Sequence, residues 1–198
     1  ISEQNGVEGA RIISREESLI IEPKVQCEKS LWIPSTGIVD SHLVMSKLEN
    51  LSLSRDIPIL YNLELNNIKK LDNGYRIDFI NDNSTITTEY IINCAGLWAH
   101  NIANQLLESK YTVEYYKGDY FKTSDIKDLN CLIYPIPKDL SLGVHVVLNL
   151  NGEVLFGPNV YKVDNINYQN DDRYKKVFLE QANQLLSHSH VRQMGFPP

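Results

Sequence analysis

Two Asn-Gly pairs, each beside a run of alternating apolar residues, constrain the fold of this chain more than any other feature. Asn73-Gly74 follows residues 57–71, and Asn151-Gly152 follows residues 143–150. An Asn-Gly pair tolerates the positive φ angles that a type I′ turn needs at both central positions, and this turn joins antiparallel strands. Each pair therefore predicts a β-hairpin.

The first hairpin is expected to extend into a three-stranded meander. Alternation along residues 57–68 and along 75–79 predicts two strands, and a polar turn at 81–84 leads to a third strand at 85–92. This strand ends in small residues, after which a helix is predicted with one apolar face, made of Ile102, Ala103, Leu106 and Leu107.

Two earlier helices are predicted from their capping residues. Ser14 and Glu17 have the form of a capping box, so a short helix should follow and end before Pro23. Asp40 is the expected N-cap of a second helix, in which Leu43, Val44, Lys47 and Leu48 recur at helical spacing.

The remaining elements complete an α+β reading. Strands are expected at 111–121 and 131–134, and a final helix at 171–186 carries Tyr174, Val177, Phe178, Ala182 and Leu185. The predicted fold class is therefore α+β, with helices and a large, mostly antiparallel sheet.

Composition narrows the class of function. The formal net charge of −6 offers no basic face to nucleic-acid phosphates, so a small molecule is the expected ligand. No apolar run approaches the roughly 18 residues of a membrane span, so a soluble, cytoplasmic protein is expected. Three widely spaced cysteines favour a reducing compartment and buried, inert thiols. No cluster has metal-ligand spacing, so no metal is expected.

Five segments follow one another in a distinctive order. They are residues 33–42, residues 91–99, Lys117-Gly118-Asp119-Tyr120-Phe121, residues 132–137 with 142–145, and residues 156–159. In this order they resemble landmarks of the L-2-hydroxyglutarate dehydrogenase group, within the D-amino-acid-oxidase-like family of flavoproteins. The Lys-Gly-Asp-Tyr-Phe, Tyr-Pro-x-Pro and Leu-Gly-Val-His pieces are the most specific.

The resemblance implies an enzyme with an FAD domain and a substrate domain folded from interleaved segments. Residues 1–56 and 110–170 would belong to the substrate domain, 57–109 to the FAD domain, and 171–198 to a helix leading back to the FAD domain. A hydride would pass from C2 of a 2-hydroxy acid to FAD. The family's use of quinones leaves peripheral association with the inner membrane open.

The sequence departs from the family in two places. None of its ten glycines forms the Gly-x-Gly-x-x-Gly fingerprint, and the family's later Gly-x-Arg-Pro segment is missing. We therefore expect an interior fragment that is inactive alone, carries no stoichiometric FAD and associates with itself through exposed apolar surface. A glycerol-3-phosphate dehydrogenase, an amine or amino-acid oxidase, or a non-catalytic remnant are the alternatives.

Two histidines are candidate catalytic bases. Alternation places His145 on the face opposite Val144 and Val146, on a strand that runs beside the substrate pocket in the family. An imidazole that titrates near neutral pH suits the removal of a hydroxyl proton. The alternative is a half-exposed sheet histidine. His42 is the second candidate, although packing or capping is the commoner role for its position.

Candidate binding residues are found for the substrate and for the cofactor. Lys117, Tyr120 and Tyr134 are candidates for contact with the substrate, with a solvated lysine and packing tyrosines as alternatives. On the cofactor side the candidates are the backbone groups of Cys94, Ala95, Gly96, Leu97 and Trp98, where small residues at a helix start admit a phosphate. An ordinary strand-to-helix turn explains the same residues.

Overall fold

The computed structural model describes residues 2–80, 82–108, 110–137, 143–169, 171–186 and 191–197. The chain divides into two compact units. Unit 1 comprises Ile1–Ser41 and Tyr115–Pro198, and unit 2 comprises His42–Glu114. The landmark residue Leu142 and the histidines His188 and His190, which were predicted to be surface residues, lie outside the described residues.

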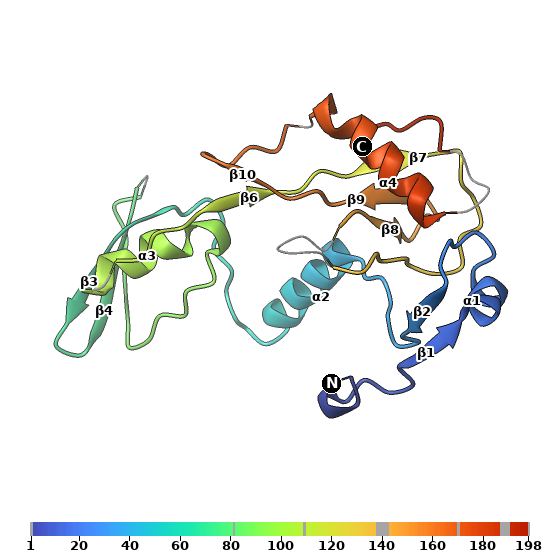
Figure 1. Ribbon diagram of the computed structural model, residues 1–198. Helices are drawn as coiled ribbons and strands as arrows, with labels where there is room; N and C mark the ends of the chain where they lie inside the picture. Colours follow the sequence, from blue (N-terminus) through green and yellow to red (C-terminus); the bar gives the residue numbers. More distant parts are fainter. Residues whose placement is uncertain are drawn as a thin grey trace. The chain divides into compact units, whose positions relative to one another are not determined.

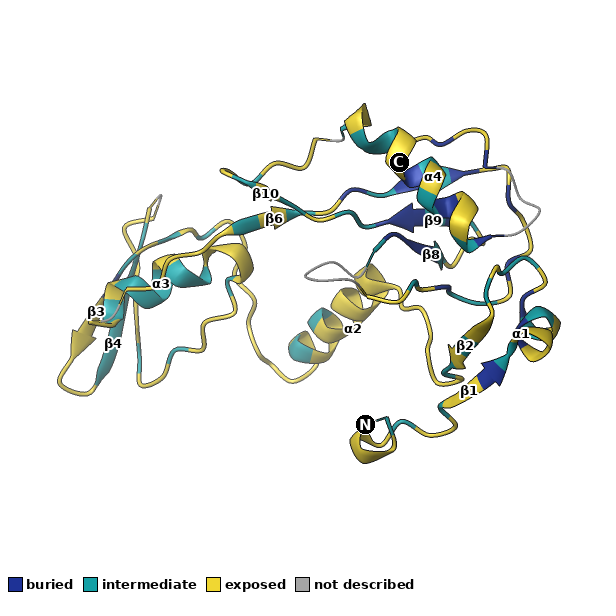
Figure 2. Cartoon of the chain, viewed as in Figure 1, coloured by how far each residue is buried: buried dark blue, intermediate teal, exposed yellow. Residues whose placement is uncertain are grey.

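The core of unit 1 is a three-stranded antiparallel sheet covered by one helix (Figure 1). Its order is β7 (Phe121–Thr123), β9 (Val154–Gly157) and β8 (His145–Leu148). The helix α4 (Lys175–Leu185) follows a 3-10 turn, η3 (Asp172–Tyr174). The Phe121 and Phe178 rings meet edge to face, 4.7 Å apart, and both are fully buried. Figure 2 shows buried, dark blue segments on β9 and on α4.

The sheet is extended at both edges by single pairs of backbone hydrogen bonds. Ile133 exchanges two bonds of 2.9 Å with Val146, and Lys122 exchanges bonds of 2.7 and 2.9 Å with Gly195. The predicted strand at 131–134 is thus reduced to a one-residue bridge, because the chain leaves the sheet edge immediately before and after Ile133.

The N-terminal part of unit 1 forms a second small sheet. After η1 (Glu3–Asn5), β1 (Arg11–Ser14) pairs with β2 (Lys29–Trp32), and α1 (Arg15–Ile21) lies between them in sequence. The capping box is confirmed, because the Glu17 N–H donates to Ser14 Oγ at 3.2 Å and the Ser14 N–H donates to Glu17 Oε2 at 3.1 Å. A third sheet pairs β6 (Tyr115–Lys117) with β10 (Tyr161–Val163).

Unit 2 contains the predicted meander. Strands β3 (Leu65–Leu71), β4 (Gly74–Phe79) and β5 (Thr85–Thr88) pair antiparallel in that order. The helix α3 (Ala99–Leu106) follows a 3-10 turn, η2 (Gly96–Trp98), and contacts β3. Helix α2 (Ser41–Leu53) begins directly after Asp40, where the sequence placed its start. The α+β class with antiparallel strands is confirmed, and the strands are distributed over small sheets.

Several predicted strands are shorter than the alternation suggested. Residues 57–64 and 89–92 form no strand, and β6 covers only part of 111–121. A strand needs a neighbour to receive its N–H and C=O groups, and within the described residues neither 57–64 nor 89–92 belongs to a sheet. In addition, Asn62 has a φ of 59°, which interrupts an extended run.

The two Asn-Gly turns are not type I′. Gly74 and Gly152 have φ values of 105° and 76°, whereas Asn73 and Asn151 are absent from the non-glycine residues with positive φ in the described chain. In the second turn, Asn149 Oδ1 accepts from the N–H of Asn151 at 3.0 Å and from the N–H of Glu153 at 2.9 Å. These bonds favour a longer loop in which only the glycine needs a left-handed conformation.

Two side-chain predictions need correction. Cys94 is exposed, and Cys27 and Cys131 are half-buried, so the three thiols are not uniformly buried. Burial and the nearby Glu22 raise the pKa of the Cys131 thiol. Val177, predicted on the apolar face of the last helix, is 46% exposed because Phe178 and Ala182 fill the contact with the sheet.

Candidate functional site

Alternation along the strands of the unit 1 sheet places apolar core residues on one face and His145 on the other. Val146 and Phe156 are cross-strand partners and face α4 in the core. His145 pairs with Gly157 one position along, so both must lie on the opposite face. This confirms the predicted orientation of His145 relative to Val146. His145 is only 8% exposed, so it is not a half-exposed sheet residue.

Tyr134 lies beside His145. The Ile133–Val146 bridge holds residue 134 next to the start of β8. The two rings are 4.5 Å apart at an interplanar angle of 64°, an edge-to-face contact. Tyr134 is also 51% exposed, so the buried imidazole packs against a ring that solvent reaches.

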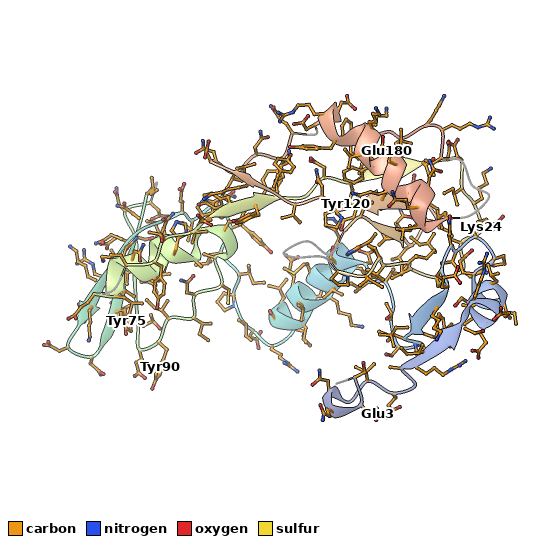
Figure 3. The ribbon with its side chains drawn as sticks, in the orientation of Figure 1. Glu3, Lys24, Tyr75, Tyr90, Tyr120 and Glu180 are labelled. Atoms are coloured by element: carbon orange, nitrogen blue, oxygen red, sulfur yellow. The ribbon has the colours of Figure 1, made fainter. Side chains whose placement is uncertain are left out.

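Tyr120 reaches the same face from the residue before β7. A Cβ placed on Gly157 would lie 2.6 Å from Cδ1 of Tyr120, so the ring rests directly over Gly157. Burial and the neighbouring Tyr134 raise the pKa of Tyr120. Figure 3 labels Tyr120 beside the sheet. The structure thus brings together three candidates from separate segments: Tyr120, Tyr134 and His145.

Lys117 has partners within the protein. Its Nζ lies 3.4 Å from Oδ1 of Asp119, with the two side chains 13% and 1% exposed, and it also donates to the carbonyl of Gln169. A solvated lysine is therefore not what the structure shows. Contact of Lys117 with a substrate carboxylate stays a prediction, and it would compete with the Asp119 ion pair.

Sequence reasoning did not single out Asp119, Tyr161 and Gly157. Asp119 lies inside the Lys-Gly-Asp-Tyr-Phe landmark and Gly157 inside the Phe-Gly-Pro-Asn landmark, which was the only signal for either residue. Tyr161 had no signal, because its relation to Asp119 depends on the pairing of β6 with β10, which no local pattern predicts.

The cofactor-side candidates form a turn in unit 2. Asn93 spans this turn, since its Nδ2 donates to the Ala99 carbonyl at 2.8 Å and its Oδ1 accepts from the Ala95 N–H at 3.2 Å. Gly96 has a φ of 54°, and a Cβ there would meet no atom within 4 Å. Cys94, Leu97 and Trp98 are not buried. His42, also in unit 2, is an exposed residue of the first turn of α2.

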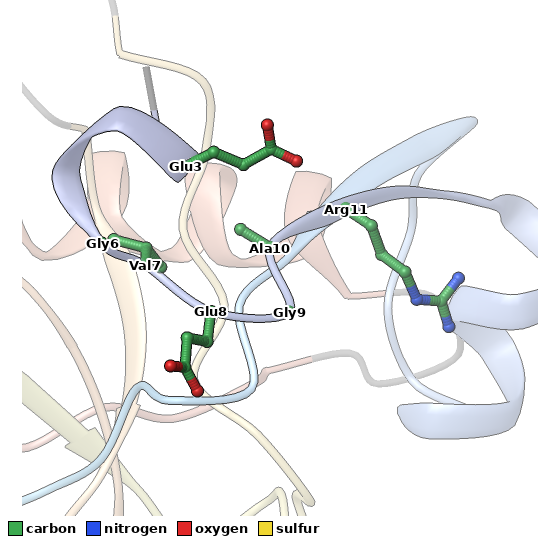
Figure 4. Close-up of a pocket in the computed structure, with 7 residues that line it drawn as sticks. All are labelled: Glu3, Gly6, Val7, Glu8, Gly9, Ala10 and Arg11. Carbon is green, nitrogen blue, oxygen red and sulfur yellow. The ribbon is translucent and has the colours of Figure 1, made fainter.

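A separate hollow lies at the N-terminus of unit 1, lined by residues between Glu3 and Arg11 (Figure 4). It contains none of the candidate residues. Its cation, Arg11, is already paired with Glu17 at 2.9 Å, and Glu3 and Glu8 would repel an anionic ligand. Over the described parts of both units, no group of three or more His, Cys, Asp or Glu side chains is arranged to hold a metal.

Comparison with known proteins identifies the family. The family model described as "FAD dependent oxidoreductase" matches residues 1–195, so the chain belongs to this family of flavin-dependent oxidoreductases. Mitochondrial L-2-hydroxyglutarate dehydrogenase of Arabidopsis thaliana is 33% identical over 192 residues, covering 79% of this chain and 40% of that protein. Glycerol 3-phosphate dehydrogenase of Caloramator mitchellensis is 29% identical over 160 residues, covering 79% of this chain and 33% of that protein.

Solved structures show the same fold. L-proline dehydrogenase from P. horikoshii matches with a TM-score of 0.81 and 16% identity, over 99% of this chain and 52% of that chain. L-alpha-glycerophosphate oxidase from Mycoplasma pneumoniae, with FAD bound, matches with a TM-score of 0.75 and 24% identity, over 91% of this chain and 49% of that chain. The chain thus spans about half or less of the relatives it matches. No helix in the described ranges is long and apolar enough to cross a membrane.

Proposed function

We propose that the sheet face bearing His145, Tyr134 and Tyr120 is the substrate side of an FAD-dependent 2-hydroxyacid dehydrogenase, with L-2-hydroxyglutarate as substrate. The observation that carries the proposal is an imidazole in ring contact with one phenol, Tyr134, with a second phenol, Tyr120, over the cross-strand partner Gly157, on the face opposite α4. The similarity to L-2-hydroxyglutarate dehydrogenases supports the choice of substrate.

Each of the three side chains has a role that follows from its chemistry. The imidazole of His145 accepts the proton of the C2 hydroxyl as the C2–H bond breaks, which leaves a 2-oxo acid. The Tyr120 hydroxyl is protonated at neutral pH, burial raises its pKa further, and it can donate a hydrogen bond to a carboxylate. Tyr134 is half exposed and packs its ring against the imidazole, so its hydroxyl is proposed to orient the incoming acid.

FAD would supply the two-electron acceptor for the hydride of C2. The turn at 93–98 fits an approaching phosphate in part, since Gly96 is open and the turn precedes a helix. On this basis we assign 57–109 to the FAD domain and 1–56 with 110–170 to the substrate domain. The lack of a Gly-x-Gly-x-x-Gly fingerprint in these 198 residues predicts that they carry no stoichiometric FAD by themselves.

A second candidate substrate is glycerol 3-phosphate. The Caloramator relative favours it, because its identity to this chain is close to that of the hydroxyglutarate dehydrogenases. The two substrates differ chemically: one carries two carboxylates beside a secondary alcohol, the other carries a phosphate. Because Lys117 is already paired with the buried Asp119 carboxylate, it leaves less positive charge for a phosphate dianion, which favours the carboxylate substrate.

Ligand titration of the 198-residue chain tests the proposal without requiring flavin. Histidine labelled with ¹³C in the ring gives one signal per histidine, and His145→Gln assigns that of His145. L-2-hydroxyglutarate should shift the His145 signal in a saturable manner, with D-2-hydroxyglutarate and glycerol 3-phosphate acting only at higher concentration. A lower midpoint for glycerol 3-phosphate would support the second candidate. An unmoved His145 signal with all three would contradict the substrate-side assignment.

A further inference from the structure

A buried charged network lies beneath Tyr120 in unit 1. Asp119 is 3% exposed, and its two carboxylate oxygens have different partners. Oδ1 is 3.4 Å from Lys117 Nζ, and Oδ2 accepts a hydrogen bond of 2.8 Å from the Tyr161 hydroxyl. The Asp119 backbone N–H donates to Oδ1 of Asn159 at 2.7 Å. The carboxylate is therefore held from β6 and from β10, and the Asp119 backbone is held from the loop between β9 and β10.

The backbone on both sides of Asp119 is pressed against neighbouring segments. A Cβ on Gly118 would lie 2.6 Å from Pro158 Cβ and 2.8 Å from the Asn159 carbonyl oxygen. A Cβ on Gly157 would lie 2.6 Å from the Asp119 carbonyl oxygen. Only glycine permits such close approach at these two positions. The segment 118–120 therefore has little freedom to shift as long as Asp119 stays in place.

This constraint bears directly on the candidate site. Tyr120 follows Asp119, and its ring rests over Gly157, the cross-strand partner of His145. A carboxylate with 1% of its side chain exposed is costly to bury without a cation, so the Lys117 charge is required for Asp119 to remain inside. Removal of Lys117 would favour movement of Asp119 toward water, and Tyr120 would move with it.

We propose that Lys117 and Asp119 are positioning residues whose buried ion pair, completed by the Tyr161 hydroxyl, holds Tyr120 over Gly157 on the His145 face. Lys117 then acts on the substrate through Tyr120 and not as a carboxylate-binding cation. The importance of the Tyr120 position for catalysis rests on the proposed function. The effect of the ion pair on that position does not rest on it, and it is measurable without substrate or flavin.

A double-mutant cycle on the 198-residue chain tests the ion pair. Lys117→Met, Asp119→Asn and the double variant are compared by urea unfolding. Lys117→Met leaves a buried unpaired carboxylate, so it should lower the folding constant most, and adding Asp119→Asn should restore it by roughly tenfold, the scale of coupling between contacting charged residues. Lys122→Met is the matched control, because its 3.2 Å pair with Glu153 is 35% and 40% exposed; adding Asp119→Asn to it should give no recovery.

The signal of Tyr120 distinguishes positioning from stability alone. With ¹³C-labelled tyrosine rings and Tyr120→Phe for assignment, the Tyr120 signal should move in folded Lys117→Met, return in Lys117→Arg, and stay in place in Lys122→Met. If Lys117→Met does not fold, Tyr161→Phe takes its place, because it removes one hydrogen bond and keeps both charges. Additive energies, or an unmoved Tyr120 signal in these folded variants, would overturn the proposal, whatever the outcome of the ligand titration.

Discussion

The hydroxyl of Tyr161 on β10 binds the buried carboxylate of Asp119. Tyr161 donates to Asp119 at 2.8 Å, and its ring lies 5.0 Å from that of Tyr174. Burial, followed by the hydrogen bond to Asp119, raises the pKa of Tyr161 to about 12. Nearby, hydrogen bonds from Arg173 lower the pKa of Asp171 to about 2, so this second carboxylate stays charged beside the tyrosine.

The shift at Tyr161 predicts a specific loss of stability at high pH. Its ordinary pKa is 10.0, so the unfolded chain releases the proton near pH 10, while the folded chain retains it until about pH 12. The folded state binds more protons in this window, and the stability contributed by Tyr161 is complete below pH 10 and lost as the pH rises toward 12.

Urea unfolding of the parent and of Tyr161→Phe should therefore show a stability difference that is constant from pH 8 to 9.5 and shrinks above pH 10. Both proteins should carry Lys117→Arg, since a guanidinium keeps its charge throughout this range. A difference that does not depend on pH up to 11.5 would show that the folded and unfolded chains hold the Tyr161 proton equally.

At the scale of elements, the features that depend on residues close together in the chain were predicted from the sequence. The capping box of α1, the start of α2 and the three-stranded meander were all anticipated, because each depends on residues close together in the chain. The absence of a strand at 57–64 and at 89–92 was not anticipated, because alternation shows only that a segment suits a strand and the partner decides whether one forms.

In the candidate site, too, features set by nearby residues were predicted and contacts between distant segments were not. The orientation of His145 followed from its alternation with Val146, and Tyr120 and Tyr134 were nominated from their landmarks. The Lys117–Asp119–Tyr161 network was not foreseen. It joins β6 and the following residues to β10, and a sequence pattern contains no information on which distant strand will be the neighbour.

The two hairpin glycines should respond differently to alanine. At Gly152, with φ 76° and no atom near a new Cβ, only backbone strain is added, about 1–2 kcal/mol. At Gly74, with φ 105°, the Cβ would also lie 2.3 Å from the Thr88 carbonyl oxygen of β5, so a loss of about 3 kcal/mol or more is expected. Amide exchange measured at β4 and β8 reports each unit separately. Equal losses in the two variants would contradict the close approach of β5 to Gly74.

At the scale of the whole molecule, the chain exposes much apolar surface. In unit 2, Tyr90 and Ile92 are 80% and 87% exposed, and apolar residues of α2 including Val44 and Leu48 are also exposed (Figure 2). Apolar surface of this kind favours association. We therefore predict that the 198-residue chain forms dimers or larger species in sedimentation velocity.

The association should depend on α2. Val44→Lys with Leu48→Lys places two like charges one turn apart on its surface and should shift the chain toward monomer. Lys47→Gln, on the same helix, is the control and should leave the association unchanged. A parent chain that sediments as a monomer at 100 µM would contradict the prediction.

The central claim, that the His145 face holds the 2-hydroxy acid during its oxidation, is tested most directly by flavin reduction in a stopped-flow instrument. In FAD-loaded enzyme containing these residues, His145→Gln should lower the limiting rate with L-2-hydroxyglutarate by about 10²–10⁴-fold, the usual contribution of a positioned base, with unchanged flavin content. His42→Gln tests the second candidate base, and a rate within a small factor of the parent would leave His145 as the base. If His145→Gln reduces its flavin as fast as the parent at saturating substrate, the base is not His145, and a large loss in His42→Gln would place it there instead.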